Sequence, residues 1–425
     1  MIRIIEGVQE RKSLFTRRKE LVEGLSETVA AIIRDVRQRG DEALMDYTER
    51  FDGIRLARFE VTEAEMDAAV RGADAALVDA LEMAANNIRM FHVKQLRRGF
   101  VMDERPGVVL GQKVTPIASV GLYVPGGTAA YPSTVLMNAI PAVIAGCPDV
   151  CITTPPGTGG SISQAVLLAA KIAGVHRVLK VGGAQAVAAL AYGTESIRRV
   201  DKITGPGNAY VTEAKRQVFG DVGIDMVAGP SEIMIVADEK SNPAHLAADL
   251  LSQAEHDPLA SAVLATDSRE LADRVAREID RQLAQLPRAN IARASIENNG
   301  VIVVTKDISE AVDIANELAP EHLELCVDDP FALLYSVKNA GSVFLGRYTP
   351  EAVGDYIAGT NHTLPTNGTA RFSSPLSVDD FVKTTQFTYY SRGALARDAA
   401  AVCLLAEQEG LQAHAASVRI REESI

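Results

Sequence analysis

Residues 119–154 read SVGLYVPGGTAAYPSTVLMNAIPAVIAGCPDVCITT, and this stretch decides the expected fold class. It opens with a short β-rich run, passes through a Pro/Gly loop, continues as an Ala-rich helical segment near 134–145, and closes with a second β-rich run at 150–154. A strand, a helix and another strand in this order are typical of a βαβ unit with a parallel sheet. We therefore expect an α/β protein.

The same alternation continues outward as far as residue 345. The first set of expected strands is Ser119–Val124, Val150–Thr154, Arg177–Val181, Val200–Thr204 and Glu232–Ala237, with helices near 134–145, 161–173, 184–192 and 208–218. The second set has expected strands at 261–266, 301–305, 323–327 and 342–345, with helices at 268–285 and 308–318. Two α/β modules in tandem, each with a parallel sheet, are therefore expected.

Both ends of the chain have a helical pattern instead. Apolar residues recur at helical spacing between 29 and 36, and residues 62–65 form a capping-box pattern before another helix. The last fifty or so residues are expected to be helical from about Ser377, after a long polar loop at 360–374. A loop of that length in a compact protein is usually functional or disordered.

Composition limits the classes of protein to which this chain can belong. A hydrophobic fraction of 47% and a charged fraction of 23% are ordinary for a globular protein. The formal net charge of −12 disfavours nucleic acid and anionic membranes as partners. No stretch approaches the roughly 18 apolar residues of a membrane span, and the start has no secretory signal pattern. We therefore expect a cytoplasmic protein that binds neither nucleic acid nor membrane.

Three glycine-rich loops follow expected strands. They occupy residues 121–127, 157–160 and 205–208. Free backbone amides at a helix start can hold a phosphate, and ligands usually bind at the carboxyl ends of parallel strands. None of the loops matches GxGxxG, so the dinucleotide signal is weak by itself. Together they indicate a crevice, with tight βα turns as the alternative explanation.

Two pairs of polar residues in the second module could carry chemistry. Gln253 and His256 lie three residues apart at the end of an expected helix, so an amide oxygen and an imidazole on one face could hold a metal ion. Glu321 and His322 follow a proline that must end a helix, and they lead into a strand. An acid and a base at that position could face a crevice.

Two more pairs lie nearer the C-terminus. Asp355 and His362 belong to a loop of small and polar residues, and Glu409 and His414 stand five residues apart. Solvated helix ends, capping turns and surface histidines also explain these pairs, and spacing alone does not decide between the explanations. The four cysteines contain no CxxC pair, so a thiolate zinc site is not expected.

Seven motifs in one order resemble those of the histidinol dehydrogenase family. They are GLYVPGG (121–127), GGAQAVAALAYGT (182–194), KITGPGNAYVTEAKRQV (202–218), AGPSE (228–232), SQAEH (252–256), LAPEHLEL (318–325) and GDYIAGTNHTLPT (354–366). Each motif alone is modest, but the ordered set is specific and spans roughly residues 20–420. The resemblance implies oxidation of L-histidinol through L-histidinal to L-histidine, the final steps of histidine biosynthesis, with reduction of two NAD.

The resemblance also implies a role for each polar pair. Glu321 and His322 are the expected acid–base residues. One zinc ion per subunit is expected, with the ligands Gln253, His256, Asp355 and His414. The expected contacts of the substrate, including those through the metal site, are Ser231, Gln253, His256, His322, Asp355, His362, Glu409 and His414. The expected contacts of NAD are Tyr123, Gln185 and Asn208.

The chemistry of these residues agrees with the implied roles. Nitrogen and oxygen donors suit zinc at about 2.0–2.2 Å without any thiolate. His322, neutral near pH 7, is a suitable base for the alcohol proton, and Glu321 could take a proton from water that attacks the aldehyde. The weak dinucleotide fingerprint fits as well, because the resemblance implies incomplete Rossmann-like domains.

The family's organisation implies domain limits and a dimer. The expected parts are an N-terminal arm at 1–18, a first Rossmann-like domain with the zinc and catalytic residues at 19–122 and 231–375, a second one that contacts NAD at 123–230, and a helical C-terminal domain at 376–425. The family forms an intertwined homodimer with shared active sites. Glu409 and His414 would therefore complete the site of the partner subunit.

Three other interpretations remain open from the sequence. A relative on the same zinc scaffold could oxidise another small alcohol, such as a sulfonated diol. A zinc hydrolase could use Glu321 beside the metal, but the loops expected to contact NAD would then have no role. A non-catalytic binding protein is the third interpretation.

Overall fold

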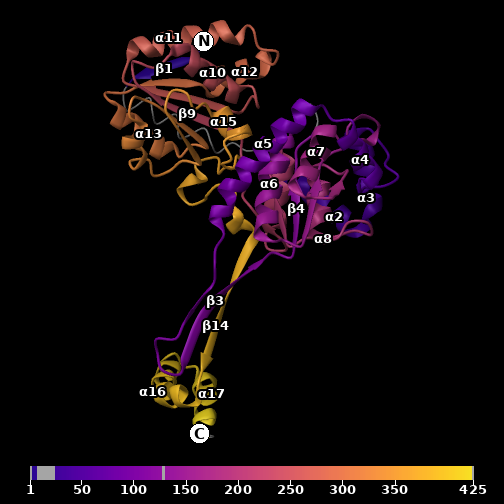
Figure 1. The fold of residues 1–425 in the computed structure, drawn as a ribbon, viewed down its shortest axis with the longest axis vertical. Coiled ribbons are helices and arrows are strands. Elements are labelled where there is room, and N and C mark those ends of the chain that lie inside the picture. Colours follow the sequence, from indigo (N-terminus) through magenta and orange to yellow (C-terminus); the bar gives the residue numbers. More distant parts are fainter. Residues whose placement is uncertain (1, 7–23, 127–129, 424–425) are drawn as a thin grey trace. The chain divides into compact units, whose positions relative to one another are not determined.

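The structure is a computed structural model that describes residues 2–6, 24–126 and 130–423. It confirms the expected α/β class (Figure 1). The chain forms two compact units, which are unit 1 (Met1–Gln95 and Ala118–Phe381) and unit 2 (Leu96–Ile117 and Val382–Ile425). Unit 1 contains both parallel sheets.

The first sheet of unit 1 has five parallel strands in the order β6-β5-β4-β7-β8. The strands are β4 (Ser119–Tyr123), β5 (Asp149–Thr153), β6 (Arg177–Leu179), β7 (Lys202–Thr204) and β8 (Gly223–Ile224). The helices between them are α6 (Pro132–Ala145), α7 (Gln164–Ala173), α8 (Gly183–Tyr192) and α9 (Ala209–Val218), with a 3₁₀ turn η3 (Thr158–Gly160). The alternation predicted β4 to β7 and all four helices, but not the two-residue strand β8.

The N-terminal helices pack against the helices that flank this five-stranded sheet. They are α2 (Leu25–Arg39), α3 (Asp41–Asp52), α4 (Glu63–Arg71) and α5 (Ala75–His92), followed by the 3₁₀ turn η2 (Val93–Gln95). The predicted capping box is present, because the Thr62 hydroxyl accepts from the Glu65 N–H while the Glu65 carboxylate accepts from the Thr62 N–H. Val29 and Leu44 share an apolar core with Leu190 and Ile203. The apolar faces of α2 and α3 are therefore buried against α8 and α9.

The second sheet of unit 1 has six parallel strands in the order β1-β11-β10-β9-β12-β13. The strands are β1 (Arg3–Glu6), β9 (Glu232–Ala237), β10 (Ser261–Thr266), β11 (Val301–Val304), β12 (His322–Cys326) and β13 (Ser342–Leu345). The helices are α10 (Pro243–Ala254), α11 (Arg269–Leu283), α12 (Ala289–Asn299), α13 (Ile308–Leu318), α14 (Pro330–Leu334) and α15 (Glu351–Tyr356). Apolar cores cover both faces of the sheet, so its four central strands, β11, β10, β9 and β12, are almost wholly buried.

Two features of this sheet differ from the sequence expectation. The run Glu232–Ala237 was expected in the first set of strands, but it forms a central strand of the second sheet. Residues 3–6 of the expected N-terminal arm form the edge strand β1 beside β11, while residues 1 and 7–18 lie outside the described residues. A four-residue strand that pairs with a partner about three hundred positions away has too little local signal to be recognised from its own sequence.

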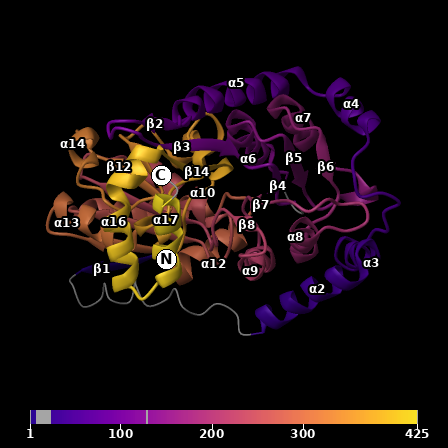
Figure 2. The ribbon, with the colours of Figure 1, turned by 90° about the horizontal axis from the view of Figure 1, so that it is seen from below.

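Unit 2 contains an antiparallel sheet and a helical hairpin. The strands, in the order β14-β3-β2, are β2 (Phe100–Met102), β3 (Val108–Pro116) and β14 (Val382–Tyr390). The helices α16 (Arg392–Gln408) and α17 (Gln412–Glu423) lie side by side (Figure 2). The expected helix from Ser377 is wrong between Val382 and Tyr390, because the β-branched and aromatic stretch VKTTQFTYY pairs along its whole length with β3.

The remaining short elements lie between β13 and β14. They are the 3₁₀ turns η4 (Thr369–Arg371) and η5 (Val378–Phe381). The rest of the segment 360–374 has no helix or strand, as expected for a loop.

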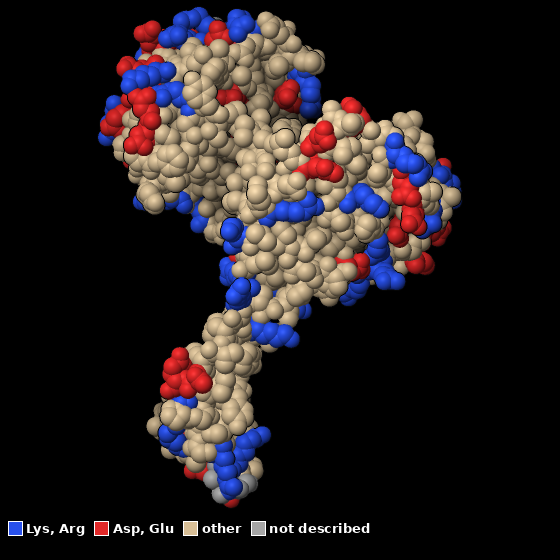
Figure 3. Space-filling model, in the orientation of Figure 1, with Lys and Arg blue, Asp and Glu red and all other residues tan. Residues whose placement is uncertain are grey.

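Two surface properties agree with the composition. Among the described residues, every helix is too short or too polar to cross a membrane. On the face drawn in Figure 3, acidic and basic side chains are interspersed.

Candidate active site

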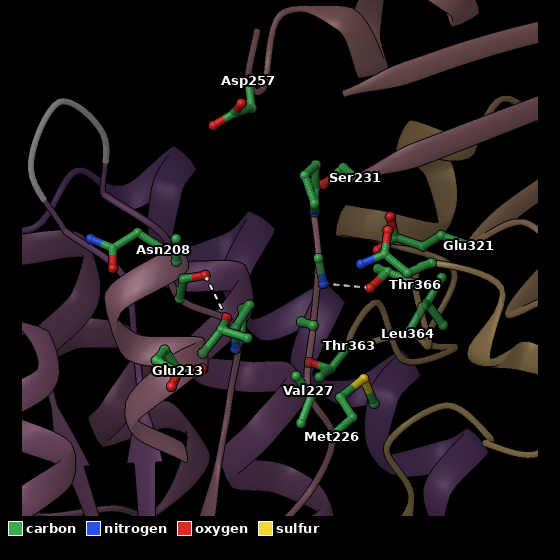
Figure 4. A pocket seen from close by; sticks show the side chains of 18 of the residues that line it. Asn208, Glu213, Met226, Val227, Ser231, Asp257, Glu321, Thr363, Leu364 and Thr366 are labelled. Atoms are coloured by element: carbon green, nitrogen blue, oxygen red, sulfur yellow. Dashed lines mark hydrogen bonds between the residues drawn. The ribbon is translucent and has the colours of Figure 1, made fainter. Parts of the chain in front are cut away.

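One cavity of unit 1 collects several of the predicted site residues. Its volume is about 600 Å³, and it is lined by the turn 205–208 after β7, the segment 226–231 before β9, and the loop 362–367. In Figure 4, Asn208 and Glu321 lie on opposite sides of the cavity, with Ser231 between them. Residues of both parallel sheets therefore face the same space.

Glu321 and His322 stand at the amino end of β12, as the sequence predicted. Helix α13 ends at Leu318, and Ala319 takes a left-handed conformation (φ 50°) that turns the chain into the strand. Both side chains are buried and are held by β9. The Glu321 Oε2 accepts from the Glu232 N–H at 2.9 Å, and the His322 Nδ1 lies 3.0 Å from the Glu232 carbonyl oxygen.

Burial and neighbouring charges shift the pKa values of this pair. Burial raises the pKa of the Glu321 carboxyl to about 8. Burial lowers the pKa of His322, but the nearby carboxylates of Glu321 and Asp355 outweigh it and raise that pKa to about 10. Because a carbonyl oxygen only accepts, the hydrogen bond to Glu232 assigns a proton to Nδ1. The other ring nitrogen of His322, Nε2, faces the carboxylate of Asp355.

Asp355 approaches His322 from α15. Its Oδ1 lies 3.8 Å from the His322 Nε2, and the nearby imidazole keeps the pKa of Asp355 below its usual value although burial opposes this. His362 is half-buried next to it, and its Nδ1 lies 3.2 Å from the Asp355 carbonyl oxygen. The structure thus brings together Glu321, His322, Asp355 and His362, which are up to 41 positions apart in the chain.

Glu351 joins this cluster, although it was not among the predicted site residues. Donor atoms of His322, Glu351 and Asp355 all lie within 4.8 Å of one another. Glu351 stands four positions before Asp355 on α15, so both share one helical face, and this spacing was the available signal. The Ser252 hydroxyl donates to the Glu351 Oε2 at 3.1 Å, which ties the end of α10 to α15.

Gln253 and His256 occupy the end of α10 and the turn beyond it. Gln253 is 1% exposed, and its Oε1 has no hydrogen-bond partner among the described residues. The His322 Nε2 is buried and unpartnered in the same sense. His256 lines the cavity and lies close enough to Asp355 and His322 to interact with their charges. The unpartnered Gln253 Oε1 and the His256 imidazole, beside the Asp355 carboxylate, are a donor set that fits a divalent metal such as zinc.

The residues expected to contact NAD are distributed over two places. Asn208 is exposed on the cavity wall and caps α9, where its Oδ1 accepts from Tyr210 N and Val211 N. Tyr123 and Gln185 do not line this cavity. The Tyr123 hydroxyl accepts from the Gly183 N–H at 3.0 Å, and the buried Gln185 Oε1 has no partner among the described residues.

Glu409 and His414 belong to unit 2. Both are exposed, Glu409 as the C-cap of α16 and His414 on α17. Their placement at an active site stays a prediction.

Two parallel sheets, a shared cavity and a buried acid–base pair beside a potential metal site define an α/β enzyme. The family model described as histidinol dehydrogenase matches residues 15–422 of this chain. The chain belongs to the histidinol dehydrogenase family and is therefore an oxidoreductase.

Similar proteins agree with this assignment over nearly the whole chain. The histidinol dehydrogenase of Halalkalibacterium halodurans is 55% identical over 93% of both chains, and that of Bacillus subtilis is 52% identical over 100% of this chain and 99% of its own. The crystal structure of histidinol dehydrogenase from Elizabethkingia anophelis is 38% identical and superposes with a TM-score of 0.95. It covers 100% of this chain and 98% of that one.

Proposed function

We propose that this enzyme oxidises L-histidinol through L-histidinal to L-histidine, with two NAD and one zinc ion per subunit, as the last steps of histidine biosynthesis. The observation that carries the proposal is the buried cluster of Glu321, His322 and Asp355 beside the cavity, in a chain of this family. The buried cysteines Cys151, Cys326 and Cys403 form no disulfide among the described residues, which suits the reducing cytoplasm where we place the enzyme.

His322 is the proposed base of the alcohol oxidation. Its Nδ1–H is used by the Glu232 carbonyl, so Nε2 is left to take the proton of the substrate hydroxyl. A cation bound at Asp355 would offset the negative charge that raises the pKa of His322, and the imidazole would then be neutral and able to accept a proton. When bound, NAD accepts the hydride from the substrate carbon that carries this hydroxyl.

Glu321 is the proposed base of the second oxidation, in which water adds to the aldehyde. Its Oε2 is held by the Glu232 N–H, so Oε1 remains for the attacking water. Burial raises the pKa of this carboxyl, which makes it a stronger proton acceptor than an exposed glutamate. Glu321 lines the cavity, so substrate and water can reach it.

The proposed zinc ligands are Gln253, His256 and Asp355 of unit 1 together with His414. The unpartnered Gln253 Oε1 and the mixed nitrogen and oxygen donors support this set. When bound, zinc supplies Lewis acidity and a coordination site for the imidazole and amine of histidinol. Ser231 and His362 face the cavity and are proposed to orient the substrate, together with Glu409.

The proposed NAD contacts are Tyr123, Gln185 and Asn208. They lie at or just after the carboxyl ends of β4, β6 and β7, where ligands of parallel sheets usually bind. The unpartnered Gln185 Oε1 and the exposed Asn208 amide are polar groups that a bound nucleotide can satisfy. The domain division into a catalytic and a nucleotide-contacting part remains part of this proposal.

We further propose a homodimer in which Glu409 and His414 of one subunit complete the active site of the other. Their exposure on unit 2 supports this arrangement. Mixed dimers of His322→Asn with His414→Asn subunits test it. Shared sites restore one intact active site per mixed dimer and hence about half the specific activity. Each inactive homodimer is the control, and inactive mixed dimers would show that every chain uses its own His414.

The proposed reaction is tested by adding histidinol and NAD to the purified protein and counting NADH per substrate consumed. A ratio near two is expected, because each oxidation reduces one NAD. A ratio near one would mean that the aldehyde step is absent. Faster turnover of a sulfonated diol would reassign the substrate, and NAD-independent turnover would favour a hydrolase. Activity that survives complete removal of metal by a chelator would contradict the zinc site.

A further inference from the structure

Lys215 and Asp225 form an ion pair inside the part of unit 1 built on the five-stranded sheet. Lys215 belongs to α9 and Asp225 follows β8, and their side chains are only 2% and 1% exposed. Two charges removed from water carry a desolvation cost that their mutual attraction does not always offset. A pair this deeply buried therefore needs further hydrogen bonds to offset that cost.

Both residues of the pair form hydrogen bonds with the backbone of Gly205. The Lys215 Nζ donates to the Gly205 carbonyl oxygen at 2.9 Å, and the Asp225 Oδ2 accepts from the Gly205 N–H at 2.7 Å. The two polar groups of one residue are thus fixed by opposite charges. Charge-assisted hydrogen bonds of this kind are stronger than those between neutral groups.

Gly205 begins the turn that leads to Asn208. Its φ of +111° is strained for any side chain, and a Cβ would lie 2.1 Å from the Tyr123 carbonyl oxygen, so the turn is pressed against the end of β4. At the far end, Asn208 is held as the cap of α9. The shape of the turn is therefore determined at both ends, at Gly205 by the buried pair and at Asn208 by the helix.

The same aspartate also holds a second segment of the cavity lining. The Asp225 Oδ1 accepts from the Met226 N–H at 2.6 Å, and Met226 opens the segment 226–231 that ends at Ser231. Further along, the Gly229 N–H donates to the Thr366 hydroxyl at 2.6 Å, which ties this segment to the loop that follows His362. One carboxylate thus connects the turn of Asn208 with the segment of Ser231.

We propose that Lys215 and Asp225 are positioning residues that set the turn 205–208 for the nucleotide and keep it in register with the segment 226–231. The inference rests on the proposed NAD-dependent reaction, and neither residue is assigned contact with substrate or cofactor. Loss of the pair weakens NAD binding while the metal site on the six-stranded sheet stays intact.

The experiment compares the zinc-loaded, full-length enzyme with the variants Lys215→Met, Asp225→Asn and the double variant. Each single change leaves one buried charge without its partner, so both singles should lower Tm. The double variant removes both charges and should regain most of the lost Tm. All three are expected to bind NAD at least about 10-fold more weakly by calorimetry, with unchanged zinc content.

Lys202→Met is the matched control. This lysine also donates to a carboxylate, that of Asp380, and it opens β7 at the end away from the turn. Its NAD affinity should stay at the wild-type value.

The double variant separates positioning from stability. If it is as stable as the wild type and binds NAD normally, the pair is structural only and the proposal is overturned. Equal weakening by Lys202→Met would also overturn it. A wild-type enzyme that does not bind NAD at all would refute the proposed function and this inference together. Normal NAD binding by the wild type and by every variant would refute the inference alone.

Discussion

The two parallel sheets of unit 1 present opposite edges to the candidate active site. The five-stranded sheet offers its carboxyl edge, where the turn 205–208 follows β7. The six-stranded sheet offers its amino edge, where Ser231 precedes β9 and Glu321 precedes β12. Only the first sheet follows the usual rule that ligands bind at the carboxyl ends of parallel strands.

The two edges suit different functions, nucleotide binding at the carboxyl edge and proton transfer at the amino edge. Turns at a carboxyl edge expose backbone amides and helix starts, which suit the phosphates of a nucleotide. Residues at the amino edge of β12 are buried on a rigid strand and held by the backbone of β9. Groups that move protons need such fixed geometry and shifted pKa values. We therefore expect substitutions at the amino edge of the six-stranded sheet to change the catalytic rate and metal binding. Substitutions at the carboxyl edge of the five-stranded sheet should change nucleotide binding instead.

The largest effect is expected for His322→Asn. The asparagine amide can still donate to the Glu232 carbonyl, but the atom that takes the substrate proton is gone. We expect kcat to fall by about 10²- to 10⁴-fold, the usual contribution of a general base, while zinc content and NAD affinity stay unchanged. Steady-state kinetics and elemental analysis measure this, with the exposed His245→Asn as control. Loss of zinc in the His322 variant would mean that this residue is a ligand and not the base.

Two buried glutamines, each with an unpartnered carbonyl oxygen, test both edges with the same substitution. Gln253→Leu should weaken zinc binding by about 10- to 100-fold and leave NAD affinity intact, because only the six-stranded edge loses a donor. Gln185→Leu should weaken NAD binding without loss of zinc. Chelator competition and calorimetry measure the two affinities. The comparison fails if either variant shows the effect expected for the other.

Asn208 combines a structural and a proposed binding role, and two substitutions separate them. Asn208→Asp keeps the cap of α9 but places a negative charge where NAD phosphates are expected, so KM for NAD should rise about 10-fold at unchanged Tm. Asn208→Ala loses the cap as well and should cost about 1 kcal/mol of stability. An unchanged KM in the aspartate variant would remove Asn208 from the nucleotide site.

The smallest effect concerns Asp52 at the end of α3. Its Oδ2 is buried without a hydrogen-bond partner among the described residues, and burial raises its pKa to about 6. A carboxyl whose pKa is raised by folding stabilises the folded state at pH values below its pKa in the unfolded chain, near 3.8. That contribution is lost as the pH rises through the folded pKa of about 6. Asp52→Asn should therefore stabilise the protein at pH 8 by on the order of 1 kcal/mol, reduced by partial exposure, and have no effect at pH 4. Thermal unfolding at both pH values checks this, and equal effects at the two values would contradict it.

Much of the fold could be predicted from local pattern. The strands 232–237 and 261–266 and the helix 308–318 have the predicted bounds, because burial on both faces and helical periodicity leave a signal within a few residues. β1 and β14 escaped prediction, since each is stabilised by a distant partner, β11 for the first and β3 for the second. β1 is too short for its own sequence to identify it, whereas the β-branched and aromatic residues of β14 were an available strand signal that the prediction of a C-terminal helix overlooked.

The candidate site divides in the same way. The spacing of Gln253 and His256 and the adjacency of Glu321 and His322 were visible in the sequence, but only their resemblance to a family suggested what they do. Glu351 was missed, although it stands four positions before Asp355. The roles of Lys215 and Asp225 were not foreseeable, because their link to Gly205 depends on how α9 and β8 return to the end of β7.

The sequence by itself determined the α/β class, most strands and helices, and the family, because these depend on short-range periodicity and on ordered motifs. Only the tertiary structure decided which sheet edge each polar residue faces, that His322 turns its Nε2 toward Asp355, and that one buried ion pair joins two segments of the cavity lining. The physical reason is that pKa values, metal-ligand geometry and buried charges depend on distances in space. Those distances exist only after segments far apart in the chain have packed together.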